Sequence, residues 1–431
     1  MAAPAPRARR GASGAPGKGH RVNEHPDGSV PGLSTTAGRI FKIIRDRGPL
    51  FPADIVRRTG LAKSTVSVYV DQLASVGLIR EDVRPGGKRR RLKVAESAGY
   101  VMGVDLGQTH LNVGLCDLEG DLLGSIAEDV DLLRESPEAI LARVVGGANA
   151  LVARNGFAAS SLFGIGFALP GPVDYAHGVP VCPPVMPGWD RFPLASILHR
   201  EFTCPVFIDN DVNVMALAER NKGAAADERD FIFIKAGTGI GAGLVVDGRI
   251  YRGAKGAAGD IGHIGTGQDD TLCHCGNRGC LEALAGGRAL VVRATEAGRS
   301  GASRFLAERM AEAVPVTPDL VGRGAAAGDE ECLRILISAG KTLGDVVAKL
   351  VNFFNPSLIV VGGGLSSLGE RYVASIRESI YRRSTPLATS DLVIKRSTLG
   401  AMTGVIGSAI LVLDEIFSQN NVGRLMRPPS A

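Results

Sequence analysis

Apolar and polar positions divide the chain into a polar N-terminal segment, a short helical region and a long region of mixed strands and helices. Residues 1–37 are rich in Ala, Pro, Gly, Ser and Arg and have no apolar period. A segment of this kind buries too little apolar surface to offset the entropy lost on ordering. We therefore predict that residues 1–37 form a disordered basic tail and that residues 420–431 form a second tail.

The pattern of residues 38–98 predicts a compact helical domain. Ile40 and Ile44 mark the apolar face of a first helix. Pro52 suits the first turn of a second helix, because its missing N–H is not needed there, and Gly60 ends that helix in a turn.

A third helix is predicted over residues 63–76, where Val66, Val70 and Leu73 follow a helical period. A short apolar strand and a basic loop at residues 84–91 come next. A helix, a tight turn, a second helix and a basic hairpin together predict a winged helix-turn-helix, whose recognition helix enters the major groove of DNA.

The residues expected to contact DNA carry hydroxyl or cationic side chains, which suit phosphates and base edges. They are Lys63, Ser64, Thr65 and Ser67 in the third helix, and Lys88, Arg89, Arg90 and Arg91 in the wing. The alternative is a three-helix bundle that contacts another protein.

The charge distribution favours DNA over that alternative. The chain of 431 residues has a net charge of +5. Residues 1–98 hold 19 Lys and Arg against 8 Asp and Glu, whereas the remainder holds 30 basic and 36 acidic residues. A basic head on an acidic body indicates that the head alone binds a polyanion, which we expect to be a double-stranded operator.

The longer C-terminal region contains a weak internal repeat. An apolar strand, a Gly-containing turn, a second strand, a tight turn and a third strand begin near Tyr100 and again near Phe231. Two such halves predict a two-lobed α/β protein with a ligand cleft. We place the first lobe at residues 99–220, completed by a C-terminal helix at 402–419, and the second lobe at residues 221–401.

Three of the seven cysteines lie within eight positions, at Cys273, Cys275 and Cys280. Thiolates and a neutral imidazole are the ligands that tetrahedral zinc prefers, so the cluster predicts a structural zinc site. His263 and His274 are both candidates for the fourth ligand. The apolar runs are too short to span a bilayer and no secretory signal is seen, so we expect a cytoplasmic protein with reduced thiols and no membrane partner.

Several motifs together resemble the ROK family, which joins sugar-dependent repressors and sugar kinases. They are GDIGH at 259–263, CHCGNRGCLE at 273–282, DND at 209–211, LPGPVD at 169–174 and VVGGG at 360–364. The resemblance implies an actin-like, ribonuclease-H-like body. The preceding winged helix, with TGLAKSTVSVYVDQLASVGLI at 59–79, is similar to the repressor branch.

The resemblance also implies roles for individual residues. Zinc would be bound by His263, Cys273, Cys275 and Cys280. A sugar would be bound by Gly171, Asn210, Asp211, Asp260, His263 and Glu282. In a kinase relative, Asp211 would be the general base. Taken alone, a run such as Asp209-Asn210-Asp211 is more often a turn or a helix cap, and Glu282 is also consistent with a charge that complements a helix dipole.

The match to the kinases has departures. The kinases carry Asp-x-Gly-Gly-Thr-Lys in the first glycine turn, whereas this chain has Gln108 and His110 at the fourth and sixth positions. Asp260 stands where the family usually has Glu, which puts the identity of the sugar in doubt. A retained nucleotide site would use Gly107, Thr109, Gly237, Thr238, Gly239 and Gly363, with Mg-ATP as cofactor.

The sequence therefore predicts a sugar-responsive DNA-binding regulator, a repressor of carbohydrate uptake and metabolism genes, whose operator affinity changes with a sugar or sugar phosphate in the cleft. We expect a homodimer or homotetramer. The alternatives are an ATP-dependent sugar kinase with a DNA-binding head and a DNA-binding scaffold without a ligand. Induction and corepression by the ligand are not distinguished at this level.

Overall fold

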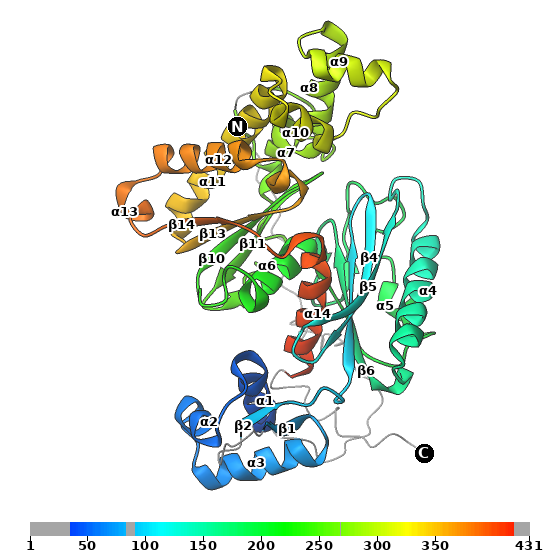
Figure 1. Cartoon of the computed structure of the whole chain (residues 1–431), viewed down its shortest axis with the longest axis vertical. Helices are drawn as coiled ribbons and strands as arrows, with labels where there is room; N and C mark the ends of the chain where they lie inside the picture. Colours follow the sequence, from blue (N-terminus) through cyan, green and yellow to red (C-terminus); the bar gives the residue numbers. More distant parts are fainter. Residues whose placement is uncertain (1–34, 83–90, 268, 418–431) are drawn as a thin grey trace, which may run out of the picture.

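The structure, a computed structural model, describes residues 35–82, 91–267 and 269–417. The chain forms a small head and two larger lobes (Figure 1). Most of the predicted N-terminal tail, the predicted C-terminal tail and most of the wing loop lie outside the described residues. Within the described ranges, no helix combines the length and hydropathy needed to cross a membrane.

The head contains three helices and a two-stranded antiparallel sheet. Its elements are α1 (Thr35–Arg47), α2 (Pro52–Thr59), α3 (Lys63–Ser75), β1 (Ile79–Asp82) and β2 (Arg91–Val94). Helix α2 begins at Pro52 and ends at Gly60, whose φ of 71° lies in the left-handed region that glycine tolerates.

The first helix begins earlier than predicted. Residues 35–37 were assigned to the disordered tail, but α1 already begins at Thr35 and Ala37 is fully buried. Ala37 lies three and four residues before Ile40 and Phe41, so it shares their face of the helix and enters the same core. The prediction was wrong because the side chain of alanine is small, so Ala37 contributed little to the apolar pattern from which the helix was predicted.

The two lobes are built around matching sheets of five strands. Their strand orders are β5-β4-β3-β6-β9 in lobe 1 and β12-β11-β10-β13-β14 in lobe 2. In each sheet the first three strands pair antiparallel and the last two join in parallel. The matching order is the structural counterpart of the repeat that the sequence predicts.

The strands of lobe 1 are β3 (Tyr100–Leu106), β4 (His110–Asp117), β5 (Leu122–Asp129), β6 (Leu162–Leu169) and β9 (Val206–Asn210), beside a hairpin of β7 (Val173–Asp174) and β8 (Val179–Pro180). Those of lobe 2 are β10 (Phe231–Ala236), β11 (Ile240–Val246), β12 (Arg249–Ile250), β13 (Leu358–Gly362) and β14 (Val393–Arg396).

Helices cover the outer faces of both sheets (Figure 1). Lobe 1 has α4 (Pro137–Asn155) and α5 (Leu194–Leu198); lobe 2 has α7 (Leu281–Ala285), α8 (Gly287–Ser300), α9 (Arg304–Ala311), α10 (Pro318–Ala326), α11 (Glu330–Phe354), α12 (Glu370–Arg383) and α13 (Pro386–Thr389). Short 3-10 turns are η1 (Ala159–Ser161), η2 (Ile261–His263), η3 (Gly364–Ser367) and η4 (Gly400–Met402).

Two helices, α6 (Asp211–Lys222) and α14 (Thr403–Ile416), lie between the sheets (Figure 1). Helix α14 returns to lobe 1 from the end of the chain. A Cβ on Gly103 of β3 would lie 2.1 Å from the carbonyl oxygen of Val405, so glycine permits this close approach. The C-terminal helix therefore completes lobe 1.

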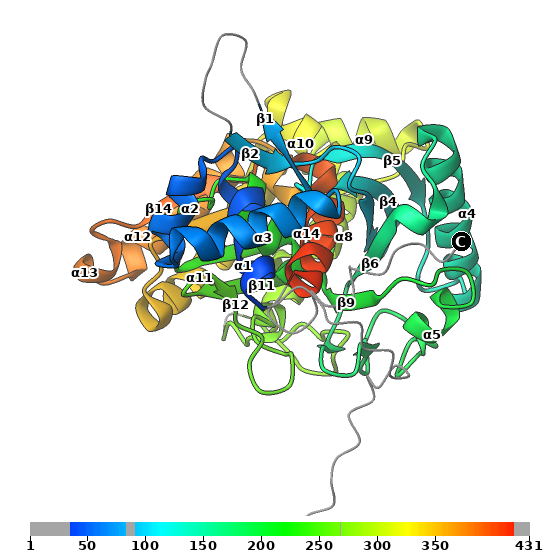
Figure 2. The ribbon, with the colours of Figure 1, turned by 90° about the horizontal axis from the view of Figure 1, so that it is seen from below.

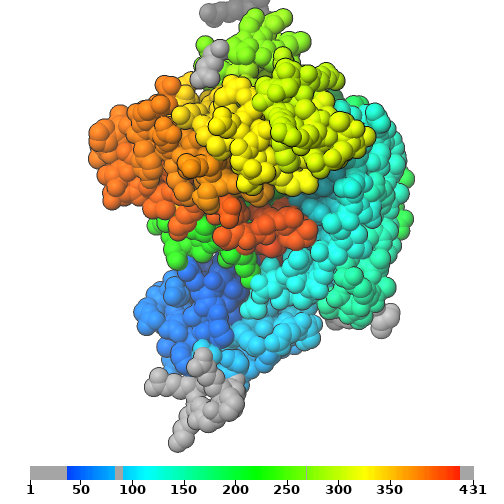
Figure 3. Space-filling view, turned by 45° about the horizontal axis from the view of Figure 1, so that its top comes forward, coloured from blue at the N-terminus to red at the C-terminus, as the bar shows by residue number. Residues whose placement is uncertain are grey.

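The head shares an apolar core with lobe 1. Phe41 of α1 and Phe417 after α14 have ring centroids 4.1 Å apart. Ile40 and Ile44 belong to the same buried cluster as Leu413. Seen from below, α1 and α14 lie together beneath the lobes (Figure 2), and the head projects from one end of the molecule (Figure 3). The head is therefore packed onto the body rather than tethered to it.

Candidate functional site

Four metal-ligating side chains converge on one point of lobe 2. His263 ends η2, and the three cysteines lie in the loop that leads into α7. The Sγ of Cys273 lies 3.6 Å from Nδ1 of His263, and the Sγ atoms of Cys275 and Cys280 lie 3.7 Å apart. The four donor atoms all lie within 4.8 Å of one another.

This spacing fits a tetrahedral metal. Zinc–sulfur bonds of about 2.3 Å place two sulfurs of a tetrahedron about 3.8 Å apart, close to the 3.7 Å between Cys275 and Cys280. The group contains His263 and not His274. Burial raises the pKa of the Cys280 thiol to about 12, so a bound cation would be needed to hold it as a thiolate.

The backbone shapes the metal loop before any ligand binds. Gly279 has a φ of 67°, and a Cβ there would lie 2.4 Å from the carbonyl oxygen of Asp269. Isolated bridges pair Gly265 with Cys280 and Leu272 with Arg278. These constraints account for the glycines between the cysteines.

Two of the predicted sugar residues meet at the start of α6. The side chain of Asn210 caps the helix by accepting a hydrogen bond from the N–H of Val212, at 3.0 Å. Its Nδ2 donates to the carbonyl oxygen of Gly171, at 2.6 Å. Asn210 therefore connects the loop after β6 to the start of α6. This helix-capping role is the one that the DND motif suggests when it is taken alone.

Asp211, the first residue of α6, is paired with a lysine that sequence reasoning missed. Nζ of Lys235, on β10, donates to Oδ2 of Asp211, and both side chains are largely buried. Burial would lower the pKa of Lys235, but the carboxylates of Asp211 and Asp105 outweigh it and raise that pKa. The pair is therefore ionic, and it joins lobe 1 to lobe 2.

A second ion pair joins the lobes beside it. Nε and a terminal nitrogen of Arg252 lie 2.9 Å and 2.7 Å from Oδ2 of Asp209. The guanidinium also stacks 3.7 Å above the centroid of the Tyr175 ring. Both aspartates of the DND motif are thus neutralised by cations from lobe 2.

The first glycine turn is filled by its own histidine. A Cβ on Gly107 would lie 2.0 Å from Cε1 of His110, so the imidazole covers the glycine. His110 Nε2 lies 3.5 Å from Oδ2 of Asp105. Asp105 is 1% exposed, and neither of its carboxylate oxygens has a hydrogen-bond partner among the described residues. Thr109, the other predicted nucleotide contact here, is exposed.

The second glycine turn, residues 237–239, contacts Glu282, which is one of the predicted sugar residues. Oε2 of Glu282 accepts a hydrogen bond from the N–H of Ile240, at 3.0 Å. A Cβ on Gly239 would lie 2.7 Å from that oxygen. Gly363 packs against the end of β10, with a φ of 82° and space for no side chain.

Asp260 lies apart from this cluster. Its side chain is exposed, and its Oδ1 is 3.9 Å from Nε2 of the metal-ligating candidate His263, beyond hydrogen-bond distance. The structure thus places Asp260 beside the metal group.

The predicted recognition helix has the expected polarity. Lys63, Ser64 and Ser67 are exposed, and Thr65 is half-buried. Val66 and Leu73 are buried on the opposite side. In the wing, Lys88, Arg89 and Arg90 lie outside the described residues, and Arg91 begins β2 with a 3.1 Å ion pair to Asp82.

Comparisons with known proteins agree with this architecture. Residues 101–415 match the ROK family, and residues 32–91 match the MarR family. The chain belongs to the ROK family. This membership and the actin-like fold with a winged-helix head confirm the expectations drawn from the sequence.

Among ROK relatives, a xylose repressor of Caldicellulosiruptor bescii is 30% identical, covering 88% of this chain and 95% of its own. A glucokinase of Halalkalibacterium halodurans is 31% identical, covering 73% of this chain and 94% of its own. The crystal structure of a ROK family transcriptional regulator, a homologue of the Escherichia coli Mlc protein, superimposes with a TM-score of 0.77 at 26% identity, covering 89% of this chain and 96% of that one.

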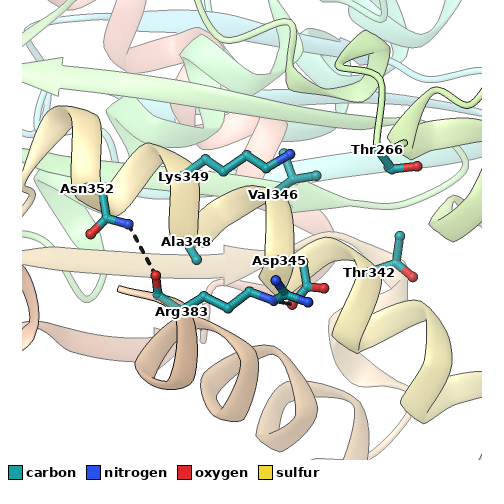
Figure 4. A pocket seen from close by; sticks show the side chains of 8 residues that line it. All are labelled: Thr266, Thr342, Asp345, Val346, Ala348, Lys349, Asn352 and Arg383. Carbon is teal, nitrogen blue, oxygen red and sulfur yellow. Dashed lines mark hydrogen bonds and ion pairs between the residues drawn. The ribbon is translucent and has the colours of Figure 1, made fainter. Parts of the chain in front are cut away.

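A cavity of about 200 Å³ lies elsewhere on lobe 2 of the ROK body (Figure 4). It opens beside α11, where Thr342, Asp345 and Lys349 line it, and the end of α12 contributes Arg383. Arg383 is paired with Asp345 at 2.5 Å. None of the predicted sugar, metal or nucleotide residues lines this cavity, but Thr266 of the loop between η2 and α7 does, so the cavity borders the candidate metal loop.

Proposed function

We propose that the protein is a sugar-responsive DNA-binding repressor of carbohydrate uptake and metabolism genes. The observation that carries the proposal is that one chain joins a winged-helix head with an exposed recognition helix to a ROK body. Alignment with a xylose repressor extends over 88% of the chain, whereas alignment with a glucokinase covers only 73%. A cytoplasmic location goes with this proposal, because the partner is operator DNA.

Two features of the cleft support a regulator rather than a kinase. The imidazole of His110 occupies the space above Gly107 where a phosphate would approach the backbone. Nζ of Lys235 already engages Oδ2 of Asp211, so that oxygen is occupied by a cation rather than aimed at a hydroxyl proton. Asp211 is then proposed to accept a hydrogen bond from a sugar hydroxyl.

The remaining cleft residues suit a ligand with several hydroxyls. Glu282, Asp211 and Asn210 offer carboxylate and amide groups from both lobes. Such groups discriminate strongly against a ligand that lacks the matching hydroxyl, because a buried acceptor is then left without a partner. We propose a sugar or sugar phosphate as the effector.

We also propose a structural zinc ion. His263, Cys273, Cys275 and Cys280 would hold it, and four protein ligands leave no open position for chemistry. The ion would fix the loop between η2 and α7, whose two ends carry the predicted sugar residues Asp260 and Glu282.

The partner is expected to be a palindromic operator bound by a homodimer or homotetramer, since two recognition helices then reach successive major grooves. The test is an operator titration with the full-length protein, with and without xylose, glucose and their phosphates. A sugar should change the operator affinity by at least about fivefold. If no member of the panel does so, the sensing part of the proposal is wrong.

The kinase alternative is tested in the same samples. The retained Asp211 is the observation that favours it. Incubation with Mg-ATP and the sugar panel should give no phosphorylated sugar. Turnover that disappears in the Asp211→Asn variant would support the kinase instead.

A further inference from the structure

A charged cluster joins the head to both of the helices that lie between the lobes. Asp414, near the end of α14, accepts hydrogen bonds on Oδ1 from Lys42 Nζ and from a terminal nitrogen of Arg45, each at 2.7 Å. Its Oδ2 accepts from Arg220 of α6. Lys42 and Arg45 belong to α1 of the head. We name these four residues the Asp414 cluster.

The cluster is ionic, and all of its members except Lys42 are largely enclosed. The side chain of Arg45 is 3% exposed and that of Asp414 is 19% exposed. Burial raises the pKa of Asp414, but Arg220, Arg45 and Lys42 outweigh it and hold that pKa well below its ordinary value. Removing one member of a buried ion pair is costly, because the other charge then stays buried without compensation.

Helix α6 connects this cluster to the sugar cleft. Asp211 begins the helix and pairs with Lys235 of lobe 2, whereas Arg220 lies in its last turn. The helix has 12 residues, which corresponds to a length of about 18 Å. Arg220 also donates to the carbonyl oxygen of Gly248, at 2.9 Å, in the turn between β11 and β12 of lobe 2. Both ends of α6 are therefore tied to lobe 2.

The neighbouring residue forms a second connection to the cleft. Glu415 accepts a hydrogen bond from the hydroxyl of Tyr175, at 2.6 Å. The ring of Tyr175 carries the guanidinium of Arg252, which pairs with Asp209 of the DND motif. Two polar connections from the cleft thus end at adjacent residues of α14.

We propose that the Asp414 cluster is the coupling element through which a ligand in the cleft sets the position of the DNA-binding head. The proposal rests on the proposed sensing function. A ligand that closes the lobes moves the turn at Gly248, and Arg220 moves with it. The hydrogen bonds of Asp414 are then redistributed between Arg220 and the two cations of α1, which changes the angle of α1 on the body.

Apolar contacts already hold the head on the body. The Asp414 cluster is therefore not needed to attach the head and can act as a coupling element. Phe41 packs on Phe417, and Ile40 and Ile44 lie in the core shared with lobe 1. These contacts do not depend on the charge of Asp414. Loss of that charge should therefore leave the head docked and able to bind DNA, while its position no longer follows the cleft.

The experiment uses the full-length protein with Asp414→Asn and the sugar that changes operator affinity most in the wild type. We expect the Kd for that sugar and the Kd for operator without sugar to stay within about threefold of wild type. The sugar-induced change in operator affinity, at least about fivefold in the wild type, should fall below about twofold. An unchanged sugar effect in this variant would overturn the proposal.

Two further variants are needed: one in case Asp414→Asn folds poorly, and one to test whether the effect is specific to the cluster. Arg45→Met combined with Asp414→Asn removes both members of the most enclosed pair, so the nearly buried Arg45 guanidinium is not left without Asp414 if the single variant folds poorly. Lys222→Met is the matched control, because it breaks the 2.6 Å pair of Lys222 with Asp121 at the same end of α6 but outside the cluster. The control should respond to sugar as the wild type does.

The outcomes separate this inference from the proposed function. No sugar effect in the wild type contradicts the sensing function itself. A sugar effect that is present in the wild type and equally lost in Asp414→Asn and Lys222→Met would show that α6 as a whole matters and that the cluster is not the coupling element.

Discussion

At the scale of single residues, Lys235 changes the chemistry of the cleft most. It is the one charged residue in the strand sequence FIFIKA, and its ammonium group pairs with Asp211. Lys235→Met would leave the Asp211 carboxylate buried without that partner. Breaking a buried pair typically costs about 3 kcal/mol, so urea unfolding should show a loss of that order.

A double variant tests whether the unpaired Asp211 carboxylate is the cause of that loss of stability. Asp211→Asn added to Lys235→Met removes the remaining charge and should restore part of the lost stability. A double variant that is no more stable than Lys235→Met would mean that the two side chains are not coupled.

Lys235 also shows which contacts could not be predicted from the sequence. The His/Cys cluster could be predicted because three of its side chains lie within eight positions and the fourth lies nearby. Lys235 and Asp211 come from different lobes, and Arg45 and Asp414 are 369 positions apart. No local sequence pattern predicts such pairs. The only indications were a lysine in an otherwise apolar strand and an acidic residue at the end of an apolar helix.

At the scale of elements, the loop between η2 and α7 should depend on metal. Cys273→Ser removes one thiolate from the cluster and should lower the zinc content of the purified protein from about one ion per chain, the expectation for one closed four-ligand site. Hydrogen exchange in the loop should rise, and the sugar response should weaken before the fold does. Elemental analysis and exchange measurements check both.

The matched control is Cys182→Ser. Cys182 is an exposed cysteine outside the cluster, so its replacement should leave the zinc content unchanged. Absence of zinc from the wild-type protein would remove the premise of the prediction.

Helix α3 carries a prediction of its own. Lys63 is exposed at the first position of the helix and should neutralise a phosphate. Lys63→Ala is expected to weaken binding to all duplexes alike and to reduce the slope of log affinity against log salt by about one. Fluorescence anisotropy at four salt concentrations measures that slope; an unchanged slope would place Lys63 away from the DNA backbone.

The elements also show why the fold could be predicted and the geometry of the cleft could not. The repeated strand-turn-strand pattern predicts the order of the first three strands in each sheet, since neighbouring strands pair through short turns. The start of α1 was misplaced because Ala37 is small, although it lies in the core. The positions of His110 and Asp260 depend on the local backbone conformation of their turns, and spacing alone does not reveal that.

At the scale of the whole molecule, a repressor that binds a palindromic operator is expected to present two heads. Two large apolar side chains on neighbouring parts of lobe 2 are nearly fully exposed: Phe353, at the end of α11, is 90% exposed and Leu387, on α13, is 86% exposed. Exposed apolar groups that gather on one face mark interaction sites. We therefore expect this edge of lobe 2, at the left of Figure 1, to contact a second copy of the chain.

Phe353→Asp and Leu387→Asp should then weaken self-association, because each places a charge in a surface that loses water on assembly. Sedimentation at several protein concentrations should show monomer at concentrations where the wild type is a dimer, and operator affinity should fall because one head alone contacts a half-site. Leu133→Asp is the control, since Leu133 is 54% exposed on lobe 1 and lies outside this edge. If the control dissociates and the two lobe 2 variants do not, the copies meet through lobe 1 instead.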